Sequence, residues 1–70
     1  MPKTHLDLFA GIGGFSLAAH WAGYTTIAAV ENEDYARRVF QKRFSGVPIY
    51  GDIREFDASG YRGTDLITAG

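Results

Sequence analysis

The chain has 70 residues, a size at which only ~60% of the unfolded surface is buried on folding, and the absence of cysteine excludes disulfides and thiolate metal sites. Its net charge of −1 lacks the basic excess of a typical nucleic-acid-binding surface, so this segment is not expected to provide most of any grip on DNA. The start carries no signal-peptide pattern and no run approaches the ~18 apolar residues of a membrane helix, so we expect a cytoplasmic protein without a membrane partner.

The first half of the chain alternates strand-like and helix-like segments. Residues 6–10 form a short apolar run that ends at Gly11. Residues 13–22 place apolar side chains at helical spacing, and Gly23 follows where a helix end favours left-handed geometry. Residues 25–30 are apolar and β-branched on both faces, as is typical of a buried parallel strand.

A second helix is predicted to begin just after residue 31. Asn32 is its expected N-cap, and Glu33 and Asp34 place negative charge where the helix dipole favours it. Glu33 with Arg37, and Asp34 with Arg38, are expected to form ion pairs at i,i+4 spacing. The side chains expected to face the sheet are Val39, Phe40 and Phe44, before Ser45 and Gly46 end the helix.

Two more strands, at 47–50 and 65–68, are predicted on either side of a polar, irregular segment at 54–63. Alternating strands and helices favour a parallel sheet with right-handed crossovers. The predicted fold class is therefore α/β and Rossmann-like, in the order β-α-β-α-β-β. Such a sheet needs further strands and helices to cover it, so we interpret residues 1–70 as the N-terminal part of one larger domain.

A glycine-rich loop connects the first strand to the first helix. Gly11, Gly13 and Gly14 permit positive φ angles and a close approach of a ligand to the backbone. The helix N-terminus that follows would attract an anionic group. The same glycines are also compatible with a simple tight turn, so the loop alone does not establish a ligand site.

Glu31 ends the second strand, 20 residues after Gly11. At this spacing Rossmann-type folds place a carboxylate on the ribose hydroxyls of a nucleotide. The alternative is a surface acid that precedes a helix. Ser16 stands where the dinucleotide fingerprint has its third glycine, which disfavours NAD. S-adenosylmethionine fits better, since its methionine carboxylate can sit at the helix N-terminus.

These residues resemble the ordered motifs of DNA cytosine-5 methyltransferases. Residues 7–15, DLFAGIGGF, are similar to the first signature motif, and Glu31 with the residues after it resembles the second. Residues 51–53 resemble the third, and residues 65–70 resemble the approach to the fourth, which continues in the family as a Pro-Cys-Gln loop. The resemblance implies a truncated S-adenosylmethionine-dependent methyltransferase fold of a bacterial restriction–modification or phage enzyme.

The resemblance also implies roles for individual residues, with S-adenosylmethionine as cofactor and S-adenosylhomocysteine as product. Phe9 would pack against the adenine, Glu31 would hold the ribose diol, and Asp52 would accept a hydrogen bond from the adenine amino group. Asp7 either orients the loop or faces the methionine ammonium, while Asn32 departs from the apolar or aromatic residue frequent at its position. The implied cofactor-binding set is Asp7, Phe9, Ala10, Gly11, Ile12, Gly13, Gly14, Glu31, Asn32, Asp52 and Ile53, without a metal ligand or a catalytic residue.

In this family a cysteine thiolate adds to C6 of a flipped-out cytosine in DNA, and C5 then takes the methyl group. The 70 residues contain no cysteine, so the resemblance implies that catalysis and DNA contacts belong to the remainder of the same catalytic domain. The 70 residues alone are expected to be inactive. Two alternatives stay open: a fragment of a Rossmann-type oxidoreductase that binds a dinucleotide, and a non-catalytic nucleoside-binding or structural fragment.

Overall fold

The computed structural model of the chain describes residues 3–54 and 56–69. These residues follow the predicted alternation of strands and helices. In chain order they form β1 (Lys3–Leu8), α1 (Gly14–Trp21), β2 (Tyr24–Val30), α2 (Asp34–Arg43), β3 (Ile49–Tyr50), the 3₁₀-helix η1 (Ala58–Tyr61) and β4 (Leu66–Ala69).

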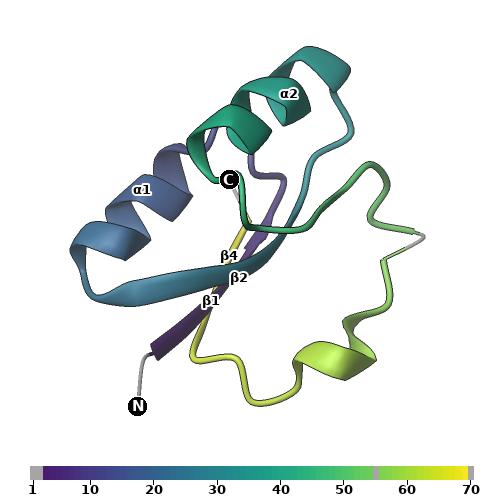
Figure 1. Cartoon of the computed structure of the whole chain (residues 1–70). Coiled ribbons are helices and arrows are strands. Elements are labelled where there is room, and N and C mark those ends of the chain that lie inside the picture. The colour runs from purple at the N-terminus through teal and green to yellow at the C-terminus, as the bar shows by residue number, and fades with distance from the viewer. Residues whose placement is uncertain (1–2, 55, 70) are drawn as a thin grey trace.

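The four strands form one parallel sheet in the order β3-β2-β1-β4, which confirms the predicted Rossmann-like arrangement. From β1 the chain steps outward to β2 and β3, and α1 and α2 lie together on one side of the sheet (Figure 1). β4 then pairs with the opposite edge of β1. In open α/β sheets, ligands bind at the carboxyl ends of the strands beside such a reversal.

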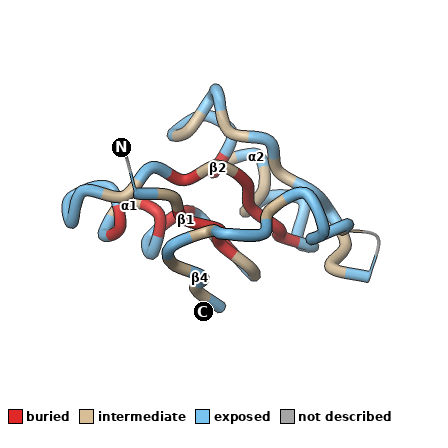
Figure 2. Tube along the Cα trace, turned by 90° about the horizontal axis from the view of Figure 1, so that it is seen from below, coloured by how far each residue is buried: buried red, intermediate tan, exposed pale blue. Residues whose placement is uncertain are grey.

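The β1–β2 pairing contains one irregularity in register. His5 pairs with Thr26 and Leu6 with Ala28, so Ile27 is an extra residue in β2. An extra residue shifts the alternation of side chains along a strand by one position. Buried residues are concentrated along β1 and β2, the two inner strands, whereas β4 at the edge of the sheet is more exposed (Figure 2).

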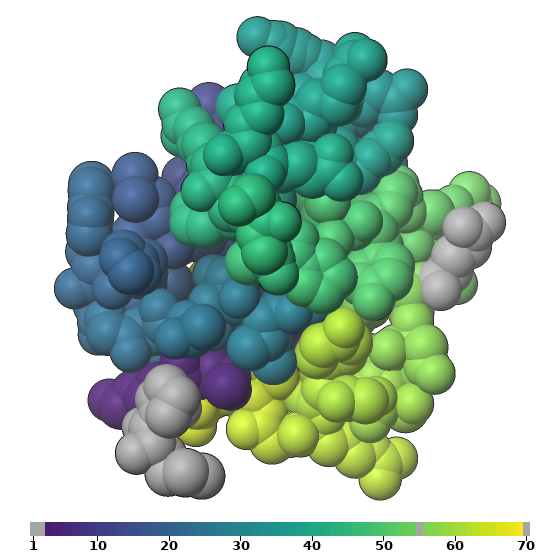
Figure 3. All heavy atoms as spheres, in the orientation of Figure 1, coloured from purple at the N-terminus to yellow at the C-terminus, as the bar shows by residue number. Residues whose placement is uncertain are grey.

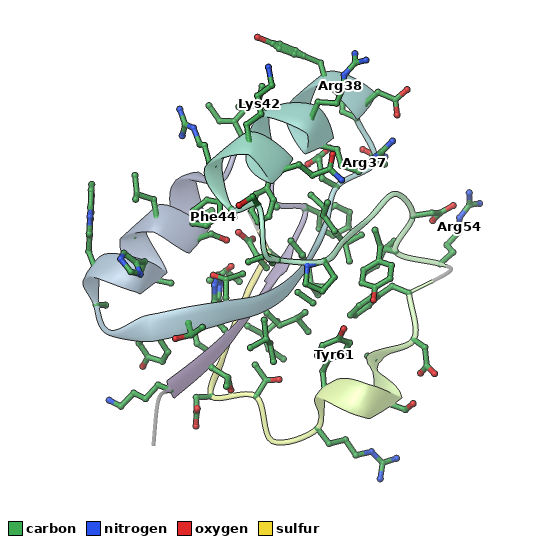
Figure 4. The ribbon with its side chains drawn as sticks, viewed as in Figure 1. Arg37, Arg38, Lys42, Phe44, Arg54 and Tyr61 are labelled. Carbon is green, nitrogen blue, oxygen red and sulfur yellow. The ribbon has the colours of Figure 1, made fainter. Side chains whose placement is uncertain are left out.

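The apolar core under α2 is small. Phe40 is fully buried against Ala10 and Ala29, and Phe44 packs against it with the ring centroids 4.8 Å apart. Phe44 points from the end of α2 toward α1 (Figure 4). The prediction that Val39 faces the sheet was wrong, because Val39 shares a shallow hollow on the outer face of α2 with Tyr35, Arg38 and Lys42.

The start of α2 also differs from the prediction. Its N-cap is Glu33 and not Asn32: the Glu33 carboxylate accepts hydrogen bonds from the amides of Tyr35 at 3.0 Å and Ala36 at 2.8 Å. The predicted i,i+4 ion pairs are replaced by an i,i+3 pair between Asp34 and Arg37. The Arg37 guanidinium also donates a hydrogen bond to the backbone carbonyl of Glu31 over 2.9 Å, which keeps it close to Asp34.

The segment predicted to be irregular contains η1, whose start is capped by Asp57 accepting from the amide of Ser59 at 2.9 Å. The rings of Tyr50, Phe56 and Tyr61 pack in sequence, with centroids 5.2 and 5.3 Å apart. In the space-filling view the yellow-green atoms of the η1 segment lie against the green atoms that follow β3 (Figure 3). Among the helices that the structure describes, none is long and apolar enough to cross a membrane.

Candidate functional site

Phe9 marks the centre of the candidate site through its backbone. It follows β1 directly and has a φ of 60°, in the left-handed region that non-glycine residues rarely adopt. This conformation costs about 1–2 kcal/mol, and such strain is concentrated at functional sites. It ends the strand two residues before the predicted end and leaves the ring 45% exposed at the carboxyl end of the sheet.

Phe9 separates two pockets. The larger has a volume of about 620 Å³ and lies over the glycine loop and the start of α1. Its lining is mostly apolar, with one carboxylate at its side. The residues that line it are Phe9, Ala10, Gly11, Gly14, Phe15, Ala18 and Glu31.

Glu31 joins the glycine loop to the segment that leads into α2. Its Oε1 accepts a hydrogen bond from the amide of Gly11 over 2.7 Å, and its Oε2 accepts one from the amide of Glu33 over 2.7 Å. The residue is only 8% exposed, so it is not a free surface acid. Because each carboxylate oxygen has two lone-pair directions, each can still accept one more hydrogen bond from a ligand.

The second pocket, of about 420 Å³, lies on the other side of Phe9. Its remaining lining residues are Val30, Asn32, Gly51, Asp52, Ile53 and Arg54. Arg54 donates to Asp52 through its amide at 2.8 Å and its Nη2 at 2.9 Å, and this pairing lowers the pKa of the Asp52 carboxyl below its usual value. Arg54 itself extends outward at the rim of the molecule (Figure 4).

The three glycines of the loop have different surroundings. Gly13 has a φ of 101°, and a methyl group at its α-carbon would come within 2.8 Å of the Phe44 ring. It is therefore required for packing α1 against α2. Gly11 has a φ of 58° but open space around it, and Gly14 has open space and lies in the pocket wall.

Three residues of the predicted set do not line either pocket: Asp7, Ile12 and Gly13. Asp7 is fully buried beneath the loop. Its Oδ2 accepts from the Ser16 hydroxyl at 2.6 Å and its Oδ1 accepts from the Thr68 hydroxyl at 3.1 Å. The geometry therefore favours the loop-orienting role over the role of facing a ligand.

Sequence reasoning missed what Ser16 and Arg54 do. Ser16 was read only as a missing glycine, yet it is fully buried and hydrogen-bonded to Asp7. The sequence feature that could have predicted this bond is a small hydroxyl residue in the first turn of a helix, shortly after an aspartate in an apolar strand. Arg54 stands two residues after Asp52, a spacing that allows a turn to bring the two side chains together.

The site combines an aromatic side chain with two carboxylates. An aromatic face lies between two hollows whose volumes are within the ~300–1,000 Å³ of small-molecule sites, and each hollow holds one carboxylate acceptor. Carboxylates recognise diol and amino groups, and an exposed ring stacks on a base. Within residues 3–54 and 56–69, no group of three or more potential ligands is placed to hold a metal ion.

Residues 4–70 match the family model described as C-5 cytosine-specific DNA methylase. The chain is 40% identical over its whole length to the Type II methyltransferase M.NgoBI of Neisseria gonorrhoeae, of which it covers 22%. It is 40% identical over 93% of its length to M2.BsuMI of Bacillus subtilis and 35% identical over 93% to M.HhaI of Haemophilus parahaemolyticus, covering 16% and 20% of those proteins. The chain therefore spans about a fifth of the length of these curated relatives.

Proposed function

Because the chain belongs to the C-5 cytosine-specific DNA methylase family, we propose that it forms the S-adenosylmethionine-binding part of a DNA methyltransferase. The whole protein would transfer a methyl group to C5 of cytosine in DNA, in the bacterial cytoplasm, as part of a restriction–modification system or a phage. The observation that supports the proposal most is the strained, half-exposed Phe9 between two pockets that each contain a carboxylate.

In this proposal each pocket takes one half of the cofactor. Phe9 would pack against the adenine, Asp52 and Ile53 would line the pocket for the base beside Asn32, and Glu31 would accept hydrogen bonds from the ribose diol. The backbone nearest the methionine portion would be that of Ala10, Gly11 and Gly14, which line the larger pocket. Ile12 and Gly13 would shape the loop without lining the pocket, and Asp7 would hold the loop from below. The cofactor supplies an electrophilic methyl group on its sulfonium.

The role of this chain is then to bind and orient, not to carry out methyl transfer. The 70 residues contain no cysteine, so the thiolate that the family's chemistry uses would come from elsewhere in the same catalytic domain. DNA contacts would also come from there, in agreement with the net charge of −1 of this segment. We do not propose the oxidoreductase alternative, because the relatives reported above are methyltransferases.

Calorimetric titration of the full-length protein tests the ligand. We expect S-adenosylmethionine and S-adenosylhomocysteine to bind more tightly than NAD. The variant Phe9→Ala should weaken S-adenosylhomocysteine binding about ten-fold, since base–aromatic stacking is worth ~1–3 kcal/mol. Tyr35→Ala removes a similarly exposed ring from α2, outside both pockets, and is the matched control.

Tritiated-methyl transfer from S-adenosylmethionine to cytosine in DNA by the full-length protein tests the reaction. Tighter binding of NAD, or equal affinities of Phe9→Ala and the unmodified protein, would contradict the proposed site. Binding without transfer to DNA would contradict the proposed reaction and leave the site standing.

A further inference from the structure

A network of hydrogen-bonded polar side chains, buried except for the half-buried Thr68, crosses the sheet. His5 is fully buried, with its Nδ1 at 2.8 Å from the Thr26 hydroxyl of β2 and its Nε2 at 2.7 Å from the Thr68 hydroxyl of β4. The Thr68 hydroxyl also reaches Asp7 Oδ1, and Ser16 of α1 bonds the other oxygen of Asp7. This network therefore joins β2, β1, β4 and α1.

The hydrogen atoms in this network can be placed from the chemistry of the Asp7 carboxylate. An ionised carboxylate only accepts, so Thr68 donates its single hydroxyl hydrogen to Asp7. Thr68 must then accept from His5, which places a hydrogen on Nε2. In the neutral imidazole Nδ1 is an acceptor, so Thr26 donates to it. All the bonds are thus directed toward Asp7.

The two oxygens of the Asp7 carboxylate accept hydrogen bonds from two different elements, α1 and β4. Ser16 lies in the first turn of α1, directly after the glycine loop. Thr68 lies in β4, directly opposite Asp7 in the β1–β4 pairing. A change at His5 would reach the cofactor loop through these contacts, although His5 lines neither pocket.

We propose that His5 is a positioning residue for the cofactor site: through Thr68 and Asp7 it fixes the first turn of α1 and the end of β4 relative to each other. This inference rests on the proposed function for its effect on the cofactor. It does not depend on that function for its effect on the structure of α1.

The inference predicts a dependence on pH. Burial lowers the pKa of His5 below its ordinary value of 6.5, against the opposing effect of Asp7. Among the described residues, this network contains one hydroxyl from each neighbouring element: Thr26 of β2, Thr68 of β4 and Ser16 of α1. The charged group that acts on His5 is Asp7. A proton on Nδ1 would turn that nitrogen into a donor, so the Thr26 hydroxyl would have to rotate and accept, while the buried ring would carry a positive charge.

The sign of the effect follows from the lowered pKa. The folded protein binds this proton less tightly than the unfolded chain, so the stabilisation is complete above pH 6.5 and is lost as the pH falls from there toward the lower folded pKa. Cofactor affinity is expected to fall in the same window. In His5→Gln, which has no titrating group at this position, that step should be absent.

The decisive variants are Thr68→Val, which keeps the shape but removes the hydroxyl, and Thr68→Ser, which keeps the hydroxyl. Thr25→Val, at an exposed position of β2, is the matched control. The first readout is the hydrogen-exchange protection of the Leu17 amide in the full-length protein. This amide donates to the Gly13 carbonyl over 2.9 Å at the start of α1. The Phe44 amide at the end of α2 serves as the internal reference. Of these three variants, we expect only Thr68→Val to lower the protection of the Leu17 amide relative to the Phe44 amide, by about ten-fold.

Affinity for S-adenosylhomocysteine, measured by calorimetry from pH 5.5 to 8, supplies the second readout. We expect Thr68→Val to weaken binding about ten-fold and Thr68→Ser to restore it. Equal relative protection of Leu17 in Thr68→Val and Thr68→Ser would overturn the inference, as would the same pH profile in His5→Gln and the unmodified protein. If the unmodified protein does not bind the ligand, the proposed function fails, and hydrogen exchange in His5→Gln and in the Thr68 variants still decides whether this network holds the start of α1.

Discussion

Gly11 and Glu31, 20 positions apart in the chain, are joined by a hydrogen bond of 2.7 Å from the Gly11 amide to Glu31 Oε1. The Glu31 carboxylate, which we propose binds the ribose, therefore also holds the glycine loop against the end of β2. Its second oxygen holds the amide of Glu33 at 2.7 Å, which starts α2. Ligand recognition and loop structure are combined in one side chain.

We predict that Glu31→Gln weakens both ligand binding and the fold. Gln has one acceptor oxygen, so its amino group would face the amide of either Gly11 or Glu33. Leaving a buried donor unsatisfied costs ~1–3 kcal/mol of unfolding free energy, and affinity should fall about ten-fold to a hundred-fold. Urea unfolding and calorimetric titration measure the two effects. In the control Glu33→Gln, at an exposed N-cap, both changes should be small; equal behaviour of the two variants would contradict the prediction.

Gly13→Ala and Gly14→Ala are predicted to separate the fold from the site. Alanine at position 13 is strained by the φ of 101° and by the 2.8 Å approach to the Phe44 ring, so it should lower the unfolding free energy by ~1–3 kcal/mol. Alanine at position 14 meets open space in the first turn of α1, so stability should stay the same or rise slightly. Its methyl group enters the pocket wall, so affinity for S-adenosylhomocysteine should fall. An unchanged unfolding free energy in Gly13→Ala would contradict the prediction and would mean that the Phe44 ring can move aside without loss.

Arg54→Ala is predicted to release Asp52 for a ligand. Hydrogen bonds from Arg54 lower the pKa of Asp52, so its removal should raise that pKa toward the usual value, as measured by carboxyl carbon NMR titration. The pair is exposed on the Arg54 side, so the melting temperature should hardly change. Affinity for S-adenosylhomocysteine should stay equal or increase a few-fold. A loss of affinity would instead make Arg54 a ligand contact. Arg62→Ala, an exposed arginine outside both pockets, is the matched control.

The isolated 70-residue chain is predicted to be only marginally stable and unable to methylate DNA. The buried apolar residues are mainly alanines, with Leu6, Val30 and Phe40 as the larger ones, and Ile67 of β4 is 58% exposed. A cooperative monomeric urea transition of ~5 kcal/mol or more would contradict the structural part. Measurable tritiated-methyl transfer by the isolated chain would contradict the chemical part.

The sequence predicted the fold class and the strands and helices because apolar periodicity and glycine positions depend on local chemistry. Helix α1 occupies the predicted range within one residue at each end, and Gly23 has the expected left-handed φ of 92°. The N-cap of α2 was mispredicted because Glu31, a residue outside the helix, takes the Glu33 amide and shifts the turn by one position. Such a contact depends on the folded loop and has no counterpart in residue propensities.

The candidate site was predicted in part for a similar reason. Phe9, Glu31 and Asp52 lie at the two pockets because their positions at the ends of strands follow from the alternation of strands and helices. The burial of Asp7 and its contacts with Ser16 and Thr68 depend on the strand order, which brings β4 beside β1. The motif spacing contains no information about that pairing.

The pairing of β1 with β4 has a consequence for how the molecule folds. The Thr4 amide finds its partner Asp65 at a sequence separation of 61 residues, whereas β1 meets β2 after about twenty. Closing the longer loop carries a larger entropy cost, which slows folding. During synthesis β1 therefore leaves the ribosome well before β4, because Thr4 and Asp65 are 61 residues apart, and one edge of β1 stays unpaired until β4 follows. In that interval the unpaired edge of β1 is open to a chaperone or to pairing with the wrong strand.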